Sequence, residues 1–203
     1  MTALIGERVL LGVTGGIAAY KSADLVRRLK QAGAEVRVVM SHSAEQFITP
    51  TTLQALSGNP VRTSLWDESA EAAMSHIELA RWASKVLIAP ASADFIARLA
   101  SGQAGDLLST LCLATTAPCL YTVASIYLAP AMNQAMWANV ATADNKNLLL
   151  QRGVHLLGPA SGEQACGDVG EGRMLEPADI VSALSGAPKP LTGKKFLITA
   201  GPS

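Results

Sequence analysis

The sequence predicts a three-layer α/β protein in which an open parallel sheet carries helices on both faces. Short apolar runs alternate with segments of helical periodicity, and clusters of glycine, serine and proline separate them. The composition agrees, because 49% hydrophobic and 16% charged residues are typical of a well-buried α/β domain or an oligomer. The length of 203 residues suits one domain of ordinary size.

The first predicted unit is the stretch RVLLGVTGGIAAYKSADLVRRLK. Its apolar run at 9–13 predicts a buried strand, Gly15 and Gly16 form a turn, and a helical pattern begins at Ile17 with Lys21 on the solvent side. Such glycines let a ligand touch the backbone, and a helix start offers free N–H groups to a phosphate. Neither the dinucleotide nor the P-loop glycine spacing occurs. FMN is therefore as good a candidate as NAD, with a bare structural turn as the alternative.

Residues 35–40 predict the second strand. Ser41 follows at its carboxyl end, where a hydroxyl can touch a bound phosphate. Ser43 is expected to N-cap a helix at 44–48, and a short edge strand is expected at 61–65.

His76 lies in residues 71–83, a stretch too irregular for a clean amphipathic helix. Histidine suits proton transfer near neutral pH, although a packed or capping role is commoner for such a residue. The next strand, 85–90, leads into the ligand crevice of an open parallel sheet. The crevice is expected to hold Ala91, Ser92, Ala93 and Asp94. Small residues there let a flat ring lie against the backbone, and Ser92 and Asp94 also offer hydrogen bonds or caps.

Helices are expected at 93–100 and 106–114, and Cys112 in the second is most simply a small buried hydrophobe. Residues 118–129 predict a strand, after which Asn133 should N-cap a helix running to about Leu150.

The segment 158–174 follows a further short strand and contains five glycines without periodicity. A long glycine-rich loop in a compact domain is typical of a mobile lid or of disorder. Cys166 lies in its middle, away from any plausible disulfide partner in the sequence, and is a candidate reactive thiol.

Bulk properties exclude several classes of function. The formal net charge is 0, so no electrostatic footprint for nucleic acid exists. No apolar run approaches the ~18 residues of a membrane span, and we expect no signal peptide before the first strand. The 3 cysteines lack a C-x-x-C spacing, which argues against structural disulfides or a zinc site and favours a reducing cytoplasm.

Four pieces of the chain carry a specific resemblance: GVTGGIAAYK at 12–21, MSHIELARWA at 74–83, PAMNQAMW at 130–137 and ACGDVGEGRM at 165–174. In this order they resemble the homo-oligomeric flavin-containing cysteine decarboxylases. Within that family they resemble the phosphopantothenoylcysteine decarboxylase domains of bifunctional coenzyme A biosynthesis flavoproteins. The resemblance implies a Rossmann- or flavodoxin-like fold.

The resemblance also implies a division of the chain. Residues 1–186 would be the FMN-dependent decarboxylase domain. Residues 187–203 would be a linker and the truncated start of the phosphopantothenate–cysteine ligase domain, so ligase activity is expected to be absent. Two places depart from the family pattern: Gly105 stands where similar proteins have asparagine, and the stretch 120–126 is longer.

The implied chemistry is the decarboxylation of 4′-phospho-N-pantothenoylcysteine to 4′-phosphopantetheine and CO2. The family oxidises the cysteine thiol to a thioaldehyde with FMN, loses CO2 to give an enethiolate, and reduces that product with the returned electrons. By resemblance His76 is the acid/base of the oxidation, Asn133 binds the substrate carboxylate, and Cys166 donates the final proton.

The resemblance assigns two sets of binding residues. The FMN set is Gly15, Gly16, Ile17, Ser41, Ala91, Ser92, Ala93, Asp94 and Ser109. The substrate set is Asn133, Met136, Ala165, Cys166, Gly167, Arg173 and Met174. The family binds FMN between subunits of a homotrimer, and four trimers form a dodecamer, so a homo-oligomer is expected. The alternatives are a peptidyl-cysteine decarboxylase of the same family and a non-catalytic FMN-binding regulatory module.

Overall fold

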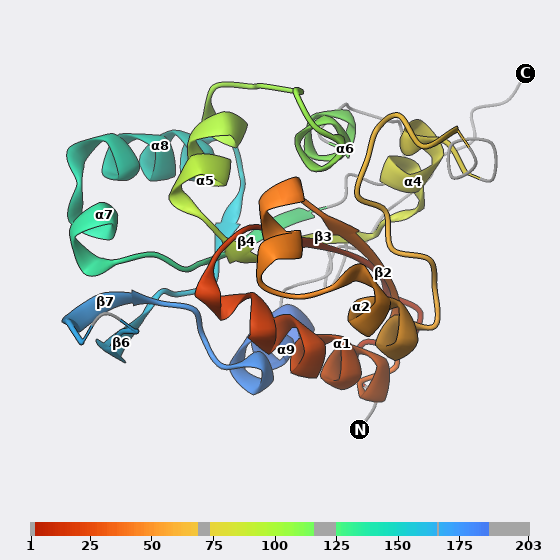
Figure 1. Cartoon of the computed structure of the whole chain (residues 1–203), viewed down its shortest axis with the longest axis horizontal. Coiled ribbons are helices and arrows are strands. Elements are labelled where there is room, and N and C mark those ends of the chain that lie inside the picture. The colour runs from red at the N-terminus through yellow and green to blue at the C-terminus, as the bar shows by residue number, and fades with distance from the viewer. Residues whose placement is uncertain (1–2, 69–73, 116–124, 166, 187–203) are drawn as a thin grey trace, which may run out of the picture.

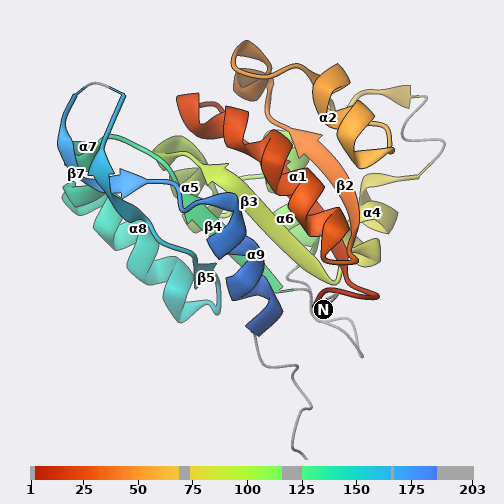
Figure 2. The same cartoon turned by 90° about the horizontal axis from the view of Figure 1, so that it is seen from below.

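A five-stranded parallel sheet forms the centre of the computed structural model, which describes residues 3–68, 74–115, 125–165 and 167–186 (Figures 1 and 2). The strand order is β2-β1-β3-β4-β5, and every neighbouring pair is parallel. The strands are β1 (Arg8–Val13), β2 (Glu35–Met40), β3 (Lys85–Ala91), β4 (Ser125–Pro130) and β5 (His155–Leu156). Because the direction of the strand order reverses between β1 and β3, the crevice at their carboxyl ends is the expected ligand position.

Helices cover both faces of the sheet, which confirms the predicted three layers. Alternate side chains of β1 separate the two cores: Val9 and Leu11 face one layer, and Leu10 faces the other. The first layer contains α1 (Lys21–Gln31), α2 (Pro50–Ser57) and α9 (Pro177–Gly186). The second contains α4 (His76–Trp82), α5 (Ala93–Ala100), α6 (Leu107–Thr115) and α8 (Val140–Gln151).

Several helix predictions near the sheet edge were wrong in detail. The expected helix at 44–48 is instead a 3-10 turn, η2 (His42–Gln46), and its N-cap is Ser41 rather than Ser43. A second 3-10 turn, η1 (Ile17–Tyr20), precedes α1. In the expected edge strand at 61–65, only an isolated bridge joins Arg62 to Val39.

The irregular stretch around His76 forms a regular helix because it starts with a complete capping box. The Ser75 hydroxyl accepts from the Glu78 N–H at 3.2 Å, and the Glu78 carboxylate accepts from the Ser75 N–H at 2.8 Å. The helix expected to run from Asn133 to about Leu150 is divided in two. Asn139 has extended backbone there and caps α8, which ends α7 (Gln134–Ala138) one residue earlier.

The glycine-rich segment 158–174 contains regular secondary structure, so the expectation of a loop without periodicity was wrong. Two antiparallel strands occupy it, β6 (Ala160–Glu163) and β7 (Val169–Arg173). Gly172 allows this packing: a Cβ added there would overlap the Met132 carbonyl oxygen. The glycines therefore let the hairpin lie directly on the β4–α7 connection.

The described ranges contain no helix long and apolar enough to cross a membrane. The predicted linker at 187–203, Cys166 and most of the long stretch at 120–126 lie outside the described residues.

Candidate active site

A cavity of about 670 Å³ opens at the carboxyl ends of β1, β3 and β4, between the glycine turn, the β4–α7 connection and the β6–β7 hairpin. This volume lies within the usual range for small-molecule sites. The structure brings ten of the predicted site residues to its wall: Gly15, Gly16, Ile17, Ser92, Ala93, Asn133, Met136, Ala165, Arg173 and Met174.

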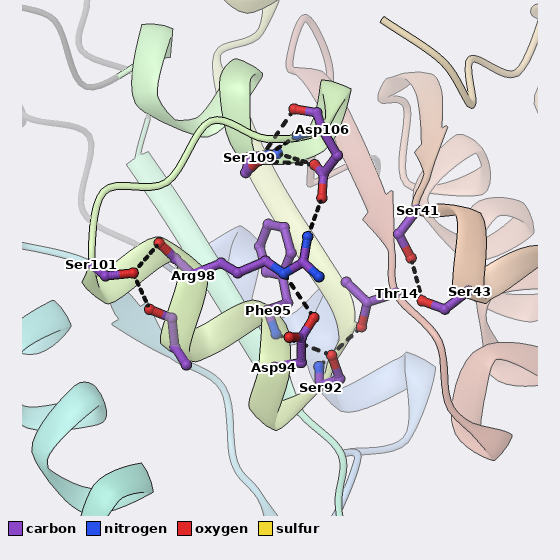
Figure 3. Close-up of polar contacts among 11 residues, drawn as sticks. Thr14, Ser41, Ser43, Ser92, Asp94, Phe95, Arg98, Ser101, Asp106 and Ser109 are labelled. Carbon is purple, nitrogen blue, oxygen red and sulfur yellow. Dashed lines mark hydrogen bonds and ion pairs between the residues drawn. The ribbon is translucent and has the colours of Figure 1, made fainter.

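Other predicted FMN residues do not line this cavity, and Figure 3 shows the polar contacts of three of them, Ser41, Asp94 and Ser109. The Ser41 hydroxyl lies 3.1 Å from that of Ser43. Ala91 is fully buried within β3. Asp94 points to Arg98 at 2.9 Å, and the buried Ser109 donates to Asp106 at 2.9 Å. Of the predicted substrate residues, Gly167 is exposed outside the cavity wall, and Cys166 lies outside the described residues.

Thr14 holds the floor of the crevice together. Its buried hydroxyl donates to the Pro90 carbonyl at 2.7 Å and accepts from the Ser92 N–H at 2.9 Å, so one side chain joins the ends of β1 and β3 (Figure 3). Ser22 adds a second tie from α1, donating to the Ala89 carbonyl at 2.9 Å. Sequence reasoning missed both residues because isolated hydroxyls carry no signal of their partners across the sheet.

The two glycines of the turn differ in what surrounds them. A Cβ added at Gly15 would lie 2.5 Å from the Ser43 hydroxyl oxygen, so η2 leaves no room for a side chain there. A Cβ added at Gly16 would meet nothing within 4 Å, although Gly16 lines the cavity. Gly15 is therefore needed by the fold, and Gly16 leaves space for a ligand next to the backbone.

Asn133 uses both ends of its amide. Its Oδ1 accepts from the Ala135 N–H at 2.8 Å, which caps α7 as predicted. Because a backbone N–H can only donate, this bond fixes Nδ2 on the other side, where it donates to the Asp168 carboxylate at 2.9 Å. The group predicted to bind a substrate carboxylate thus already binds a carboxylate from the hairpin.

Further polar contacts dock the hairpin on the β4–α7 connection. The Met132 N–H donates to the Gly172 carbonyl at 2.9 Å, and the Gln134 N–H donates to the Gln164 side chain at 3.0 Å. Trp137 Nε1 donates to the Glu171 carboxylate at 3.2 Å. The hairpin therefore forms one wall of the cavity.

Lys21 lies in the cavity wall rather than on the solvent side of its helix, contrary to prediction. Its side chain is 9% exposed, and Nζ donates to Glu176 Oε1 at 2.7 Å and to the Met174 carbonyl at 3.2 Å. Helical periodicity gave no sign of this burial, because the covering residues come from the far end of the chain.

His76 is the first residue of α4 and is not part of the cavity wall. Figures 1 and 2 both place α4 at the opposite end of the sheet from α7 and the β6–β7 hairpin. Within one chain, the structure does not bring His76 and Asn133 together.

Cys112 is fully buried in α6, as predicted. Burial, with a smaller effect of the Asp106 carboxylate, raises the pKa of its thiol from 9.0 to about 12. This cysteine is an uncharged core side chain at neutral pH.

The sequence profile of the flavoprotein family matches residues 2–187 of the chain. The chain belongs to the flavoprotein family. This chain is 58% identical over 205 residues to the coenzyme A biosynthesis bifunctional protein CoaBC of Vibrio cholerae. The match covers 100% of this chain and 50% of that protein. The chain thus spans about half the length of the curated relatives it matches.

Two solved structures share the fold of this chain. A PPC decarboxylase mutant complexed with pantothenoylaminoethenethiol superposes with a TM-score of 0.75 and 33% identity, covering 88% of this chain and 96% of that one. The FMN binding protein AtHal3 gives a TM-score of 0.73 and 33% identity over 88% and 94% of the two chains. These similarities confirm the flavodoxin-like architecture that the sequence predicts for this chain.

Proposed function

We propose that the chain is an FMN-dependent decarboxylase that converts 4′-phospho-N-pantothenoylcysteine to 4′-phosphopantetheine and CO2 in coenzyme A biosynthesis in the cytoplasm. The observation that carries the proposal is the Asn133 amide at the cavity wall, which presents an N–H donor to a carboxylate. Similarity to CoaBC proteins and to a PPC decarboxylase supports this reaction over peptidyl-cysteine decarboxylation. It also supports 1–186 as the decarboxylase domain and 187–203 as the link to a ligase domain.

The glycine turn fits the FMN that this proposal requires. The open space over Gly16 admits a phosphate close to the backbone, and Ile17 and Ala18 of η1 line the same cavity. Ser92 and Ala93 supply a small-residue surface on which a flat ring can lie. Bound FMN supplies the two-electron oxidation of the substrate thiol and the later reduction of the decarboxylated product.

The protein's own residues position the substrate and move protons. Asn133 holds the carboxylate as an anion, and Met136 contacts the same region of the wall. The hairpin supplies one wall of the cavity in which the substrate loses CO2. His76 accepts the thiol proton during oxidation, and Cys166 donates the proton that completes the reduction.

We further propose that the site is completed between subunits of a homotrimer, with four trimers forming a dodecamer. The separation of His76 from the cavity supports this, because a second chain is then needed to supply the histidine. Large apolar side chains are exposed on the cavity side as well: Ile17 is 63% and Tyr20 61% exposed.

Three measurements on one purified sample test the proposal: flavin absorbance, particle mass by light scattering, and CO2 release from 4′-phospho-N-pantothenoylcysteine. We expect bound FMN, a mass well above that of one chain, and turnover. A colourless monomer would contradict the cofactor and assembly. A yellow oligomer that binds 4′-phospho-N-pantothenoylcysteine but never decarboxylates it would support the regulatory module. Turnover of cysteine peptides alone would support the peptidyl-cysteine alternative.

A further inference from the structure

Lys21 brings a buried cation to the cavity wall. Its side chain is more than nine-tenths buried, and a charge in such a position is tolerated only when it is paired. The partner, Glu176, is 58% exposed and lies just before α9. The carboxylate can therefore turn into solvent at little cost, whereas the ammonium of Lys21 cannot.

Arg173 supplies a second cation at the same point. Its guanidinium lies 3.6 Å from Glu176 Oε1, the oxygen that Lys21 contacts at 2.7 Å. Both cations line the cavity. Glu163 is a further charged lining residue, but it is exposed and forms no ion pair with either cation among the described residues. Two cations thus converge on one carboxylate oxygen.

We infer that Lys21 and Arg173 form an anion subsite for the 4′-phosphate of the substrate, which Glu176 fills when substrate is absent. This inference rests on the proposed function and specifies how it selects a phosphorylated substrate. A phosphate monoester carries about −1.5 to −2 charges against −1 for a carboxylate, and offers three acceptor oxygens. Lysine binds it as a point charge and arginine through paired donors.

A structural role and a cofactor-binding role for these charges lead to different results. As a purely structural ion pair, Lys21 and Glu176 would tie the start of α1 to the start of α9. As part of the cofactor site, the cations would bind the phosphate of FMN, which is also a phosphomonoester.

The test compares ligands that differ only in the phosphate. For wild type, Lys21→Met, Arg173→Gln and Glu176→Gln, all loaded with FMN, kcat/KM is measured for 4′-phospho-N-pantothenoylcysteine and for N-pantothenoylcysteine. Calorimetry then gives the affinities for 4′-phosphopantetheine and pantetheine. The control is Arg27→Met, which removes an exposed cation of the same helix outside the cavity wall. Flavin content per chain is measured for every variant.

We expect Lys21→Met to lower kcat/KM and affinity by ~10- to 100-fold for the phosphorylated ligands only. Arg173→Gln should act in the same direction, and because Arg173 is exposed it tests the subsite even if Lys21→Met fails to fold. Glu176→Gln should keep or increase the preference for phosphate, and Arg27→Met should change nothing.

An equal loss for both members of each ligand pair would overturn the inference in favour of a structural ion pair. Lost flavin with an unchanged phosphate preference would overturn it in favour of the cofactor's phosphate. Equal wild-type affinity for the two products would overturn it as well. A wild-type protein that turns over neither substrate but still prefers 4′-phosphopantetheine would contradict the proposed decarboxylation and support the subsite.

Discussion

The amide of Asn133 shows how one side chain serves both the fold and the site. Its oxygen caps α7, and its nitrogen contacts a carboxylate at the cavity. Capping alone would be satisfied equally by aspartate, which is as good an N-cap. The cap therefore does not require an amide at this position, whereas the contact with Asp168 does, because only the amide can donate.

The Asn133→Asp variant separates these two roles. The cap is retained, but the hydrogen bond to Asp168 is lost, and a carboxylate then faces both Asp168 and the substrate's own carboxylate, so like charges repel. We expect FMN retention, a melting temperature that falls only modestly because Asp168 is exposed, and a loss of decarboxylation of about a hundredfold or more. The control is Asn139→Asp, since Asn139 makes the same cap on α8 outside the cavity wall. Near-normal turnover of Asn133→Asp would remove Asn133 from the site.

The thiol of Cys112 predicts a pH effect on stability. The unfolded thiol ionises near 9.0, whereas the folded thiol has a pKa of about 12. The unfolded state therefore loses its proton first, so the free energy of unfolding falls as the pH rises from about 9 to about 12. In Cys112→Ala this fall should be shallower, as measured by urea unfolding across that window. Parallel curves for the two proteins would show that the thiol does not contribute.

At the scale of elements, the β6–β7 hairpin depends on close backbone contact. A Cβ at Gly172 would overlap the Met132 carbonyl oxygen, which cannot move without displacing the β4–α7 connection. A Cβ at Gly170 would overlap the end of the Gln134 side chain, which can rotate away, and would lie 3.1 Å from the Gln134 Cβ. The two positions therefore differ in how much a methyl group should cost.

Overpacking by one methyl group costs about 1–3 kcal/mol of stability. Gly172→Ala should therefore displace the hairpin, and we expect kcat/KM to fall by at least about tenfold. Gly170→Ala should have a smaller effect, and Gly186→Ala at the end of α9, where an added Cβ meets nothing within 4 Å, should have none. Steady-state kinetics and limited proteolysis of the hairpin measure both consequences. Equal activity in all three variants would show that hairpin docking is not required.

Cys166 lies between β6 and β7 in the sequence, outside the described residues, and is proposed to supply the final proton. If it only supplies the final proton, Cys166→Ser should still allow thiol oxidation and CO2 release, because a hydroxyl is a much weaker acid than a thiol of pKa ~8.5. Anaerobic addition of substrate should therefore bleach the flavin absorbance and leave an oxidised enethiol product. His76→Asn is the matched variant in which the flavin should stay oxidised. Full turnover of Cys166→Ser without lasting bleaching would contradict the assignment.

At the scale of the whole molecule, the positions of His76 and the cavity predict complementation between inactive variants. If His76 of one chain serves the Asn133 of another, a co-expressed mixture of His76→Asn and Asn133→Asp chains contains some sites with both native residues. Random mixing in a ring should restore roughly a quarter of wild-type activity. Each variant alone should remain inactive at the same flavin content. No recovery in mixed oligomers would show that each site is built from one chain.

Local patterns in the sequence determined much of the fold. Alternating apolar runs and helical segments gave the parallel sheet, and β2 and α5 have the predicted bounds. The glycine turn, Ser92 and Asn133 were placed at strand ends by their position in the chain alone, and all of them reach the cavity. These features depend on nearby residues, so periodicity and capping rules are sufficient to find them.

Only the tertiary structure decided the features that depend on distant contacts. Lys21 is buried because residues 174–176 cover it, and the glycine-rich segment is a hairpin because α7 lies against it. The structural role of Thr14 could not be predicted from the sequence, because both hydrogen-bond partners of its hydroxyl lie at the end of β3, the neighbouring strand. The separation of His76 from the cavity is likewise a property of the sheet order, which places residues by strand pairing across the fold and not by their spacing along the chain.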